Sequence, residues 1–199
     1  MCTRLNYSPT ALNNINTFLK VEPTWVLESQ WNSPVIPAAT QDWLREKGSL
    51  TLRMKDSFAG DFSVTVEAEG WSPTFSQDAL ALELGQDSGA FVREVVLKIA
   101  EIPYVFARTT IPKDSLKSLQ QLTKLGNKPL GEVIFSYPEL KRTRLDISSI
   151  SVHQLLPSMA SLLDKQASIW ARRNTYDIHG NSFIVSEFFL PIMFQKSRC

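Results

Sequence analysis

The chain has 199 residues, of which 43% are hydrophobic, a size and composition typical of one soluble domain with a sizeable core. Its formal net charge of +1 does not favour nucleic acid or an acidic membrane surface as a partner. With only two cysteines and two histidines, the chain has almost no ligands for a zinc site.

The two ends of the chain favour a reducing cellular compartment. Cys2 and Cys199 lie at opposite termini, which argues against a disulfide framework and for a reducing environment. The N-terminus lacks the apolar run of a signal peptide, and no stretch approaches the roughly 20 apolar residues that cross a bilayer. We therefore expect a cytoplasmic protein that does not insert into a membrane.

The N-terminal part predicts little regular structure. Its prolines favour an irregular extension over residues 1–39 that packs on a domain formed by residues 40–199. A short helix is expected after Thr40 and ends at Gly48. The prolines concerned are Pro9, Pro23, Pro34 and Pro37.

The middle of the chain predicts three strands and a helix. Alternating apolar residues indicate strands at 61–69, 91–99 and 104–111. Leucines then recur at every third position and predict a helix that ends at Gly126. They are Leu116, Leu119, Leu122 and Leu125.

The C-terminal part predicts a second hairpin. Strands at 168–178 and 182–190 flank His179-Gly180-Asn181, a sequence suited to a tight turn. Residues 148–165 are expected to form a linker with a short helix. Successive hairpins with interspersed helices predict an α+β fold, an antiparallel sheet with helices around it.

Two charges fall on strand faces that are otherwise apolar. Alternation places Arg93 on the face of Phe91 and Val95, and Glu187 on the face of Val185 and Phe189. A buried charge is costly unless it is paired, and an unpaired carboxylate binds a proton. Either the two charges pair with each other in the core, or they line a pocket and face opposite ends of a small anionic ligand. Alternation alone leaves both open.

Further candidates carry less weight. Arg108 alternates with apolar residues in its strand, and Arg172 and Arg173 must point to opposite faces. His153 falls in the linker and His179 in a turn, so we expect neither to be catalytic. The sequence contains no P-loop, dinucleotide fingerprint or evident serine–histidine–aspartate arrangement.

Several short segments, in order along residues 40–193, resemble the chorismate pyruvate-lyase family. They are Asp42-Trp43-Leu44 with Gly48-Ser49-Leu50-Thr51, Val92-Arg93-Glu94-Val95-Val96-Leu97, Ala107-Arg108-Thr109-Thr110-Ile111-Pro112, Leu125-Gly126-Asn127-Lys128-Pro129-Leu130-Gly131, Trp170-Ala171-Arg172-Arg173 and Ser186-Glu187-Phe188-Phe189-Leu190-Pro191. The resemblance departs from the family where Ala107 replaces a glycine and Ser186 a threonine. It is also poor over the first forty residues.

The resemblance implies a fold and a site. The fold would be a six-stranded antiparallel sheet whose enclosed site lies under helix-turn-helix flaps at residues 43–50 and 112–130. Arg93 and the backbone N–H of Leu130 would hold the ring carboxylate of the ligand. Glu187 and the backbone at Leu50 would receive the ring hydroxyl, and Arg108 would contact the enolpyruvyl carboxylate.

The resemblance also implies an activity. Such an enzyme converts chorismate to 4-hydroxybenzoate and pyruvate without metal or organic cofactor, and supplies ubiquinone biosynthesis. We expect a product-inhibited monomer that binds no nucleic acid, with Arg93 and Glu187 as its catalytic residues. The alternatives are a non-catalytic small-anion sensor, like the effector-binding domains of transcription regulators, and an inactive paralogue. The extension does not resemble the DNA-reading helices that precede such sensors.

Overall fold

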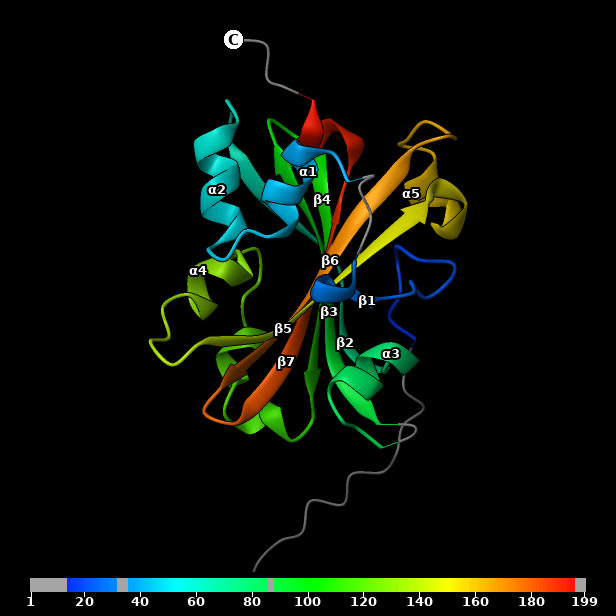
Figure 1. The fold of residues 1–199 in the computed structure, drawn as a ribbon. Helices are drawn as coiled ribbons and strands as arrows, with labels where there is room; N and C mark the ends of the chain where they lie inside the picture. Colours follow the sequence, from blue (N-terminus) through cyan, green and yellow to red (C-terminus); the bar gives the residue numbers. More distant parts are fainter. Residues whose placement is uncertain (1–13, 32–35, 86–87, 196–199) are drawn as a thin grey trace, which may run out of the picture.

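One antiparallel sheet organises the computed structural model, which describes residues 14–31, 36–85 and 88–195 (Figure 1). Its seven strands follow the order β1-β5-β6-β7-β4-β3-β2, and six of them are nine or more residues long. The strands are β1 (Val26–Leu27), β2 (Phe62–Pro73), β3 (Gly89–Ile99), β4 (Ile102–Pro112), β5 (Lys141–Ser151), β6 (Ser168–Ile178) and β7 (Asn181–Phe189). The predicted α+β class is confirmed, and β1 adds a two-residue edge to the six expected strands.

Short helices cover both faces of the sheet (Figure 1). The face that we call the pocket face carries α1 (Ala38–Leu44), α2 (Leu50–Ser57) and α4 (Leu130–Ile134). The opposite face carries α3 (Ser76–Ala81), α5 (Pro157–Ala160) and residues 14–25. Five 3₁₀ helices complete the described ranges: η1 (Glu28–Gln30), η2 (Ser115–Lys117), η3 (Gln120–Thr123), η4 (Val152–Gln154) and η5 (Pro191–Phe194). Within these ranges no helix exceeds eight residues, too few to cross a bilayer.

The predicted C-terminal hairpin is confirmed. β6 and β7 pair antiparallel from Trp170 opposite Phe189 to Ile178 opposite Asn181. The turn between them holds His179 at φ 53° and Gly180 at φ 79°. Two successive residues with positive φ match the twist of the flanking strands, and glycine adopts this conformation without a steric penalty.

Two predictions for the middle of the chain are wrong. The leucine stripe forms the separate 3₁₀ helices η2 and η3 instead of one α-helix. Three-residue spacing is the repeat of a 3₁₀ helix, but of the buried Leu119, Leu122 and Leu125 only Leu122 lies within one, in η3. Residues 148–151 end the strand β5 and are not a linker. The first half of β5 reads as loop because charged, largely exposed side chains interrupt the apolar alternation there.

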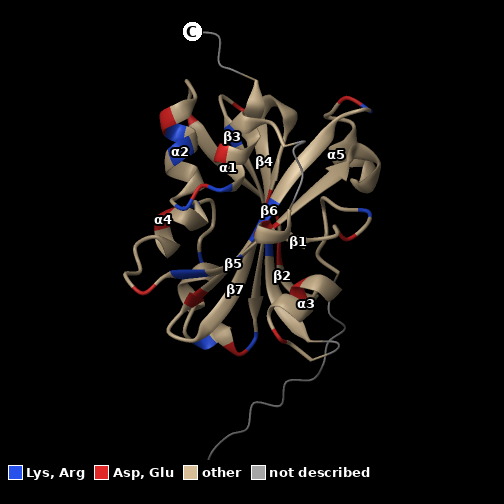
Figure 2. Cartoon of the chain, in the orientation of Figure 1, with Lys and Arg blue, Asp and Glu red and all other residues tan. Residues whose placement is uncertain are grey.

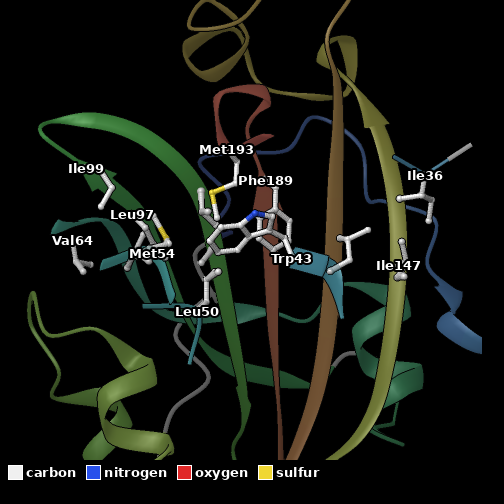
Figure 3. Packing of buried hydrophobic residues seen from close by; sticks show 14 residues of the cluster. Ile36, Trp43, Leu50, Met54, Val64, Leu97, Ile99, Ile147, Phe189 and Met193 are labelled. Carbon is white, nitrogen blue, oxygen red and sulfur yellow. The ribbon is translucent and has the colours of Figure 1, made fainter. Parts of the chain in front are cut away.

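Hydrophobic packing fixes a helical layer on each side of the sheet. On the pocket face, Trp43, Leu50 and Met54 pack against Leu97 and Phe189 (Figure 3). Each fully buried large side chain of this kind contributes about 1.5–3 kcal/mol. The N-terminal segment closes the opposite face with its own apolar cluster, formed by Phe18, Leu19 and Trp25 with Phe106 and Phe188. A division into residues 1–39 and 40–199 stays a prediction, and Cys2, Pro9, Pro34 and Cys199 lie outside the described residues.

Candidate active site

A pocket lies between the sheet and two covering segments on the pocket face. Its floor includes Arg93 and Val95 of β3, Thr109 of β4, Glu187 of β7 and Arg172 of β6. Its cover includes Gly48–Thr51 and Pro129–Gly131. The structure therefore has a pocket where the site is expected, between the sheet and the helical flaps, and its being the site stays a prediction.

Two flaps meet above this floor: the first flap, residues 38–57, contains α1 and α2, and the second flap, residues 113–134, ends in α4. A Cβ atom added at Gly131 would lie only 2.8 Å from the Oγ of Ser49. Nearby, Lys55 Nζ and Glu132 Oε1 form an ion pair at 2.7 Å. Glycine at position 131 thus allows the backbone of the second flap to approach the start of α2 (α2 and α4 are neighbours in Figure 1).

Arg93 is a buried cation with few partners. Its residue is only 2% exposed, and its Nη2 donates hydrogen bonds to the carbonyl oxygens of Gly126 (2.7 Å) and Lys128 (3.3 Å). Its Nε lies 3.7 Å from a carboxylate oxygen of the half-exposed Glu69 but has no hydrogen-bond partner among the described residues. Burial lowers the pKa of Arg93, and the charge of Glu69 counteracts only part of this effect. A buried guanidinium with spare donors is suited to bind an anion.

Glu187 has two partners from the neighbouring strand. Its carboxylate accepts hydrogen bonds from Arg172 Nε and, at 3.3 Å, from Asn174 Nδ2. Burial disfavours the charged form of Arg172, but the adjacent Glu187 outweighs it and raises the pKa of Arg172. Arg93 and Glu187 therefore do not pair with each other, and the alternative that both line one pocket is the one that the geometry supports.

Two backbone amides named from the resemblance also lie at the pocket. Leu50 and Leu130 both line it, and each is the first residue of a helix, α2 and α4 respectively. N–H groups of a first helical turn have no partner within their helix and are free to donate to another group. The structure thus brings Leu50, Leu130, Arg93 and Glu187 together around one cavity.

Arg108 lies elsewhere, which corrects its expected position in this pocket. Register places Glu94 opposite Arg108 and Arg93 opposite Thr109, so Arg108 points to the opposite face of the sheet. There its Nη1 donates to Glu94 and, at 2.7 Å, to the carbonyl oxygen of Ile15. It belongs to a buried charged cluster with Asp78, Asp146 and Arg173, and such charges are visible near the centre of the sheet in Figure 2.

Strand parity gives only a face for the pocket residue Arg172, and it does not identify the pocket residue Tyr176 or Asn174, which lies between them on β6 but does not line the pocket. All three share the face of Glu187, because alternate residues of β6 point the same way. Tyr176 lines the pocket, and burial followed by the charge of Glu187 raises its pKa to about 12. Polar side chains recurring at every second position of an otherwise apolar strand were the available signal.

No group of three or more histidine, cysteine, aspartate or glutamate side chains within the described ranges is placed to hold a metal ion. His153 lies in η4, and His179 lies in the β6–β7 turn, where its Nε2 is 3.7 Å from a carboxylate oxygen of Glu139. Neither histidine lines the pocket. The polar groups that line the pocket are two arginines, one carboxylate, a tyrosine hydroxyl, the hydroxyls of Thr51 and Thr109, and backbone amides.

Comparison with known proteins decides the family. The family model described as "Chorismate lyase" matches residues 20–199. The chain belongs to the chorismate lyase family. A "Probable chorismate pyruvate-lyase" of Methylococcus capsulatus is 36% identical over 152 residues, which cover 76% of this chain and 94% of that protein. One of Nitrosospira multiformis is 34% identical over 169 residues, covering 82% and 93%.

The family match extends beyond the site. It begins at residue 20, so it includes half of the expected 1–39 extension as well as Arg93, Arg172 and Glu187. Within this chorismate lyase family member, residues 20–31 include Trp25, which packs on the sheet. The family match therefore covers segments that pack on both faces of the sheet.

Solved structures resemble the chain in fold alone. PhnF from Mycobacterium smegmatis superposes with a TM-score of 0.58 at 16% identity, covering 75% of this chain and 66% of that one. A GntR-family transcriptional regulator from Bacillus cereus has a TM-score of 0.54 at 13% identity, covering 68% and 96%. The chorismate lyase family member thus shares its sheet architecture with proteins described as transcription regulators.

Proposed function

We propose that this protein is a chorismate pyruvate-lyase, which converts chorismate to 4-hydroxybenzoate and pyruvate. The observation that carries the proposal is one pocket with two charged ends. Arg93, whose nearest carboxylate oxygen is 3.7 Å away, lies at one end, and the carboxylate of Glu187 lies at the other. Relatives at 31–36% identity that bear this name support it.

The spacing of these two residues suits a ring with substituents at opposite ends. Arg93 pairs with Thr109, Thr109 pairs with Val185, and Glu187 lies two residues beyond Val185. Two strand spacings and a two-residue offset place their Cα atoms about 12 Å apart. Side chains that reach inward from both positions leave room for a single six-membered ring.

Each end then has a role. Arg93 and the N–H of Leu130 bind the ring carboxylate, since a guanidinium fork can donate to both of its oxygens. Glu187 accepts a hydrogen bond from the C4 hydroxyl, and the amide of Leu50 donates to the oxygen of that hydroxyl. With the two flaps closed, both contacts act away from bulk water, where they are stronger than in solution.

The reaction needs few groups. The C4–H bond breaks and its electron pair forms a ring double bond, while the C3–O bond breaks and releases the enolate of pyruvate. The enolate takes up a proton at carbon, and the ring becomes aromatic, which supplies the driving force. The protein orients the ring, excludes water and offers Glu187 as a base beside C4 or as the group that orients the hydroxyl.

A small-anion sensor is the second candidate, because the GntR-family transcriptional regulator from Bacillus cereus shares the fold, as PhnF does. Their 13–16% identity supports only the architecture, whereas the lyases are 31–36% identical over most of their length. The lyase is therefore favoured, with a cytoplasmic location and ubiquinone biosynthesis as the destination of its product.

The test is incubation of the purified protein with chorismate, in buffer treated with a chelator, while 4-hydroxybenzoate and pyruvate are measured separately. We expect both in equal amounts, above the spontaneous rate and above that of an Arg93→Ala control. Binding of 4-hydroxybenzoate without formation of either product would favour the sensor and contradict the lyase.

A further inference from the structure

Two residues of β6 that line the pocket each have a donor atom with no hydrogen-bond partner among the described residues. Arg172 is 1% exposed, and its Nε and Nη1 donate to Glu187 and to the carbonyl oxygens of Trp43 and Glu46. No residue in the described ranges accepts a hydrogen bond from its Nη2. Tyr176 is 4% exposed, and its hydroxyl likewise has no hydrogen-bond partner there. Because both residues line the pocket, these open donors are placed to bind an acceptor of a ligand there.

The ring of Tyr176 is held by packing that does not involve its hydroxyl. It stacks on Phe183 with centroids 5.6 Å apart and meets Phe135 edge-on at 6.3 Å. Its hydroxyl interacts electrostatically with Glu187 and Arg172. A tyrosine hydroxyl is protonated at neutral pH, and the pKa of Tyr176, raised to about 12, extends this range to more alkaline pH, so the hydroxyl acts as a donor.

The charge around these donors favours an anion. Arg172 and Glu187 neutralise each other as an ion pair. Arg142 adds a further positive charge: its Nη1 donates to the carbonyl oxygen of Glu46 at 2.8 Å and to Oδ1 of Asn174 at 3.4 Å. No carboxylate among the described residues lies within ion-pair distance of Arg142. Glu46 opposes this charge at Arg172, and Arg142 does not line the pocket, but the positive charge of Arg142 acts on the Tyr176 hydroxyl and favours an anion there.

From these observations, and resting on the proposed function, we propose that Arg172 Nη2 and the Tyr176 hydroxyl form a second carboxylate subsite that binds the enolpyruvyl group of chorismate. Chorismate carries this group at C3, next to the C4 hydroxyl that Glu187 receives. β6 follows β7 in the sheet, so Arg172 and Tyr176 lie beyond Glu187 as seen from Arg93. The subsite supplies the second anchor that Arg108, on the opposite face, does not supply within this pocket.

Two ligands that differ in one carboxylate test the subsite. The first is 3-(carboxymethoxy)-4-hydroxybenzoate, and the second is 4-hydroxy-3-methoxybenzoate, which has the same ring and ether oxygen. Calorimetric titration of the wild type should show tighter binding of the dicarboxylate. In Tyr176→Phe this preference should fall about tenfold, the usual effect of losing one hydrogen bond to a charged group, while the methoxy ligand binds within about twofold of wild type. The KM for chorismate should rise by a similar factor.

Controls separate this role from packing. Tyr137→Phe alters a tyrosine that does not line the pocket and whose hydroxyl donates to Gln121, and it should retain the wild-type preference. Arg172→Lys keeps the positive charge but loses Nη2, and it should also reduce the preference. Melting temperatures confirm that each variant folds. An equal loss of affinity for both ligands in Tyr176→Phe, or no loss for either, would overturn the subsite.

The two proposals fail in different ways. A protein that prefers the dicarboxylate through Tyr176 but releases no pyruvate would retain the subsite and refute the lyase. A protein that turns over chorismate with the same KM in wild type and Tyr176→Phe would retain the lyase and refute the subsite.

Discussion

Arg172 and Glu187 are direct cross-strand partners on β6 and β7, and their side chains form an ion pair inside the pocket. The pair is almost fully buried, with side-chain exposures of 1% and 10%. Arg172 also donates to carbonyl oxygens of the first flap at Trp43 and Glu46. The residue that holds Glu187 in place therefore also holds the cover of the site.

Glu187→Gln tests whether the reaction needs the negative charge of residue 187, because glutamine occupies the same position without that charge. The amide keeps the shape and one acceptor oxygen but cannot act as a base, so we expect turnover to fall by about two orders of magnitude or more. Affinity for 4-hydroxybenzoate, measured by fluorescence titration, should change only a few-fold. Because Arg172 would lose its counter-charge, a melting curve must first confirm folding. Unchanged turnover would remove Glu187 from the chemistry.

Arg93→Ala tests the ring-carboxylate contact. Removing one partner of a buried charge-assisted contact costs about 2–5 kcal/mol, so affinity for 4-hydroxybenzoate should fall at least about thirtyfold. Arg45→Ala is a matched control, because Arg45 forms an exposed ion pair with Glu28 at 2.7 Å. Titration of both variants should show the loss only for Arg93. Wild-type affinity in Arg93→Ala would assign the carboxylate to another group.

Gly131→Ala tests the contact between the flaps. The new methyl group would lie 2.8 Å from Ser49 Oγ, so either the Ser49 side chain must rotate or the second flap must move away from α2. We expect weaker 4-hydroxybenzoate binding and faster release in stopped-flow measurements, by about tenfold. Gly85→Ala, where the nearest atom is 3.9 Å from the added Cβ, is the control.

A second substitution shows whether the clash is the cause. Ser49→Ala removes the Oγ atom, so the double variant Ser49→Ala/Gly131→Ala should recover most of the affinity. The next contacts of the added methyl group are 3.4 Å and 3.8 Å away. Release as slow in Gly131→Ala as in the wild type would show that flap approach does not limit it.

Strand alternation was enough to find the central charges of the site. It placed Arg93 and Glu187 on inward faces and separated Arg172 from Arg173, because side-chain direction within one strand depends only on residue parity. Contacts between strands require register, which the sequence did not reveal. Shifting a strand by one residue against its neighbour moves every side chain to the other face of the sheet. The observed register places Arg108 beside Glu94, on the face opposite the pocket.

Pairing and helix type also escaped prediction. Arg93 pairs with Glu69 and Glu187 pairs with Arg172. Because Glu69 and Arg172 belong to other strands, the sequence could not show that Arg93 and Glu187 do not pair with each other. The three-residue leucine repeat fits either helix type over so short a segment. The flaps followed from resemblance to the family, since local patterns do not show which face a helix covers.

Thr17→Val tests how the N-terminal segment closes the opposite face. The backbone N–H and the Oγ1 of Thr17 both donate to Glu94 Oε2 at 2.6 Å, and Glu94 is fully buried. Valine keeps the shape but removes one donor to a buried carboxylate, so the free energy of unfolding should fall by about 1–3 kcal/mol. Urea denaturation measures the change. Thr143→Val, an exposed residue that loses a longer, 3.2 Å bond to the carbonyl oxygen of Thr175, should change stability by less than about 1 kcal/mol. Equal effects would mean that Glu94 does not depend on Thr17.

Tyr176 should make stability depend on alkaline pH. Burial, and then the charge of Glu187, raises the pKa of Tyr176 to about 12 in the folded protein, against about 10 in the unfolded chain. Above pH 10 the unfolded state loses this proton while the folded state keeps it. The stabilising contribution is therefore complete below pH 10 and is lost as the pH rises towards 12.

The size of this loss is measurable by comparison with Tyr176→Phe. Between pH 9 and pH 11 the free energy of unfolding of the wild type should fall by about 1 kcal/mol more than that of the variant, since one pKa unit corresponds to about 1.4 kcal/mol. Urea denaturation at the two pH values gives both changes, and other groups that titrate in this range cancel in the difference. An identical loss in both proteins would mean that the Tyr176 hydroxyl is not shielded from solvent in the pocket.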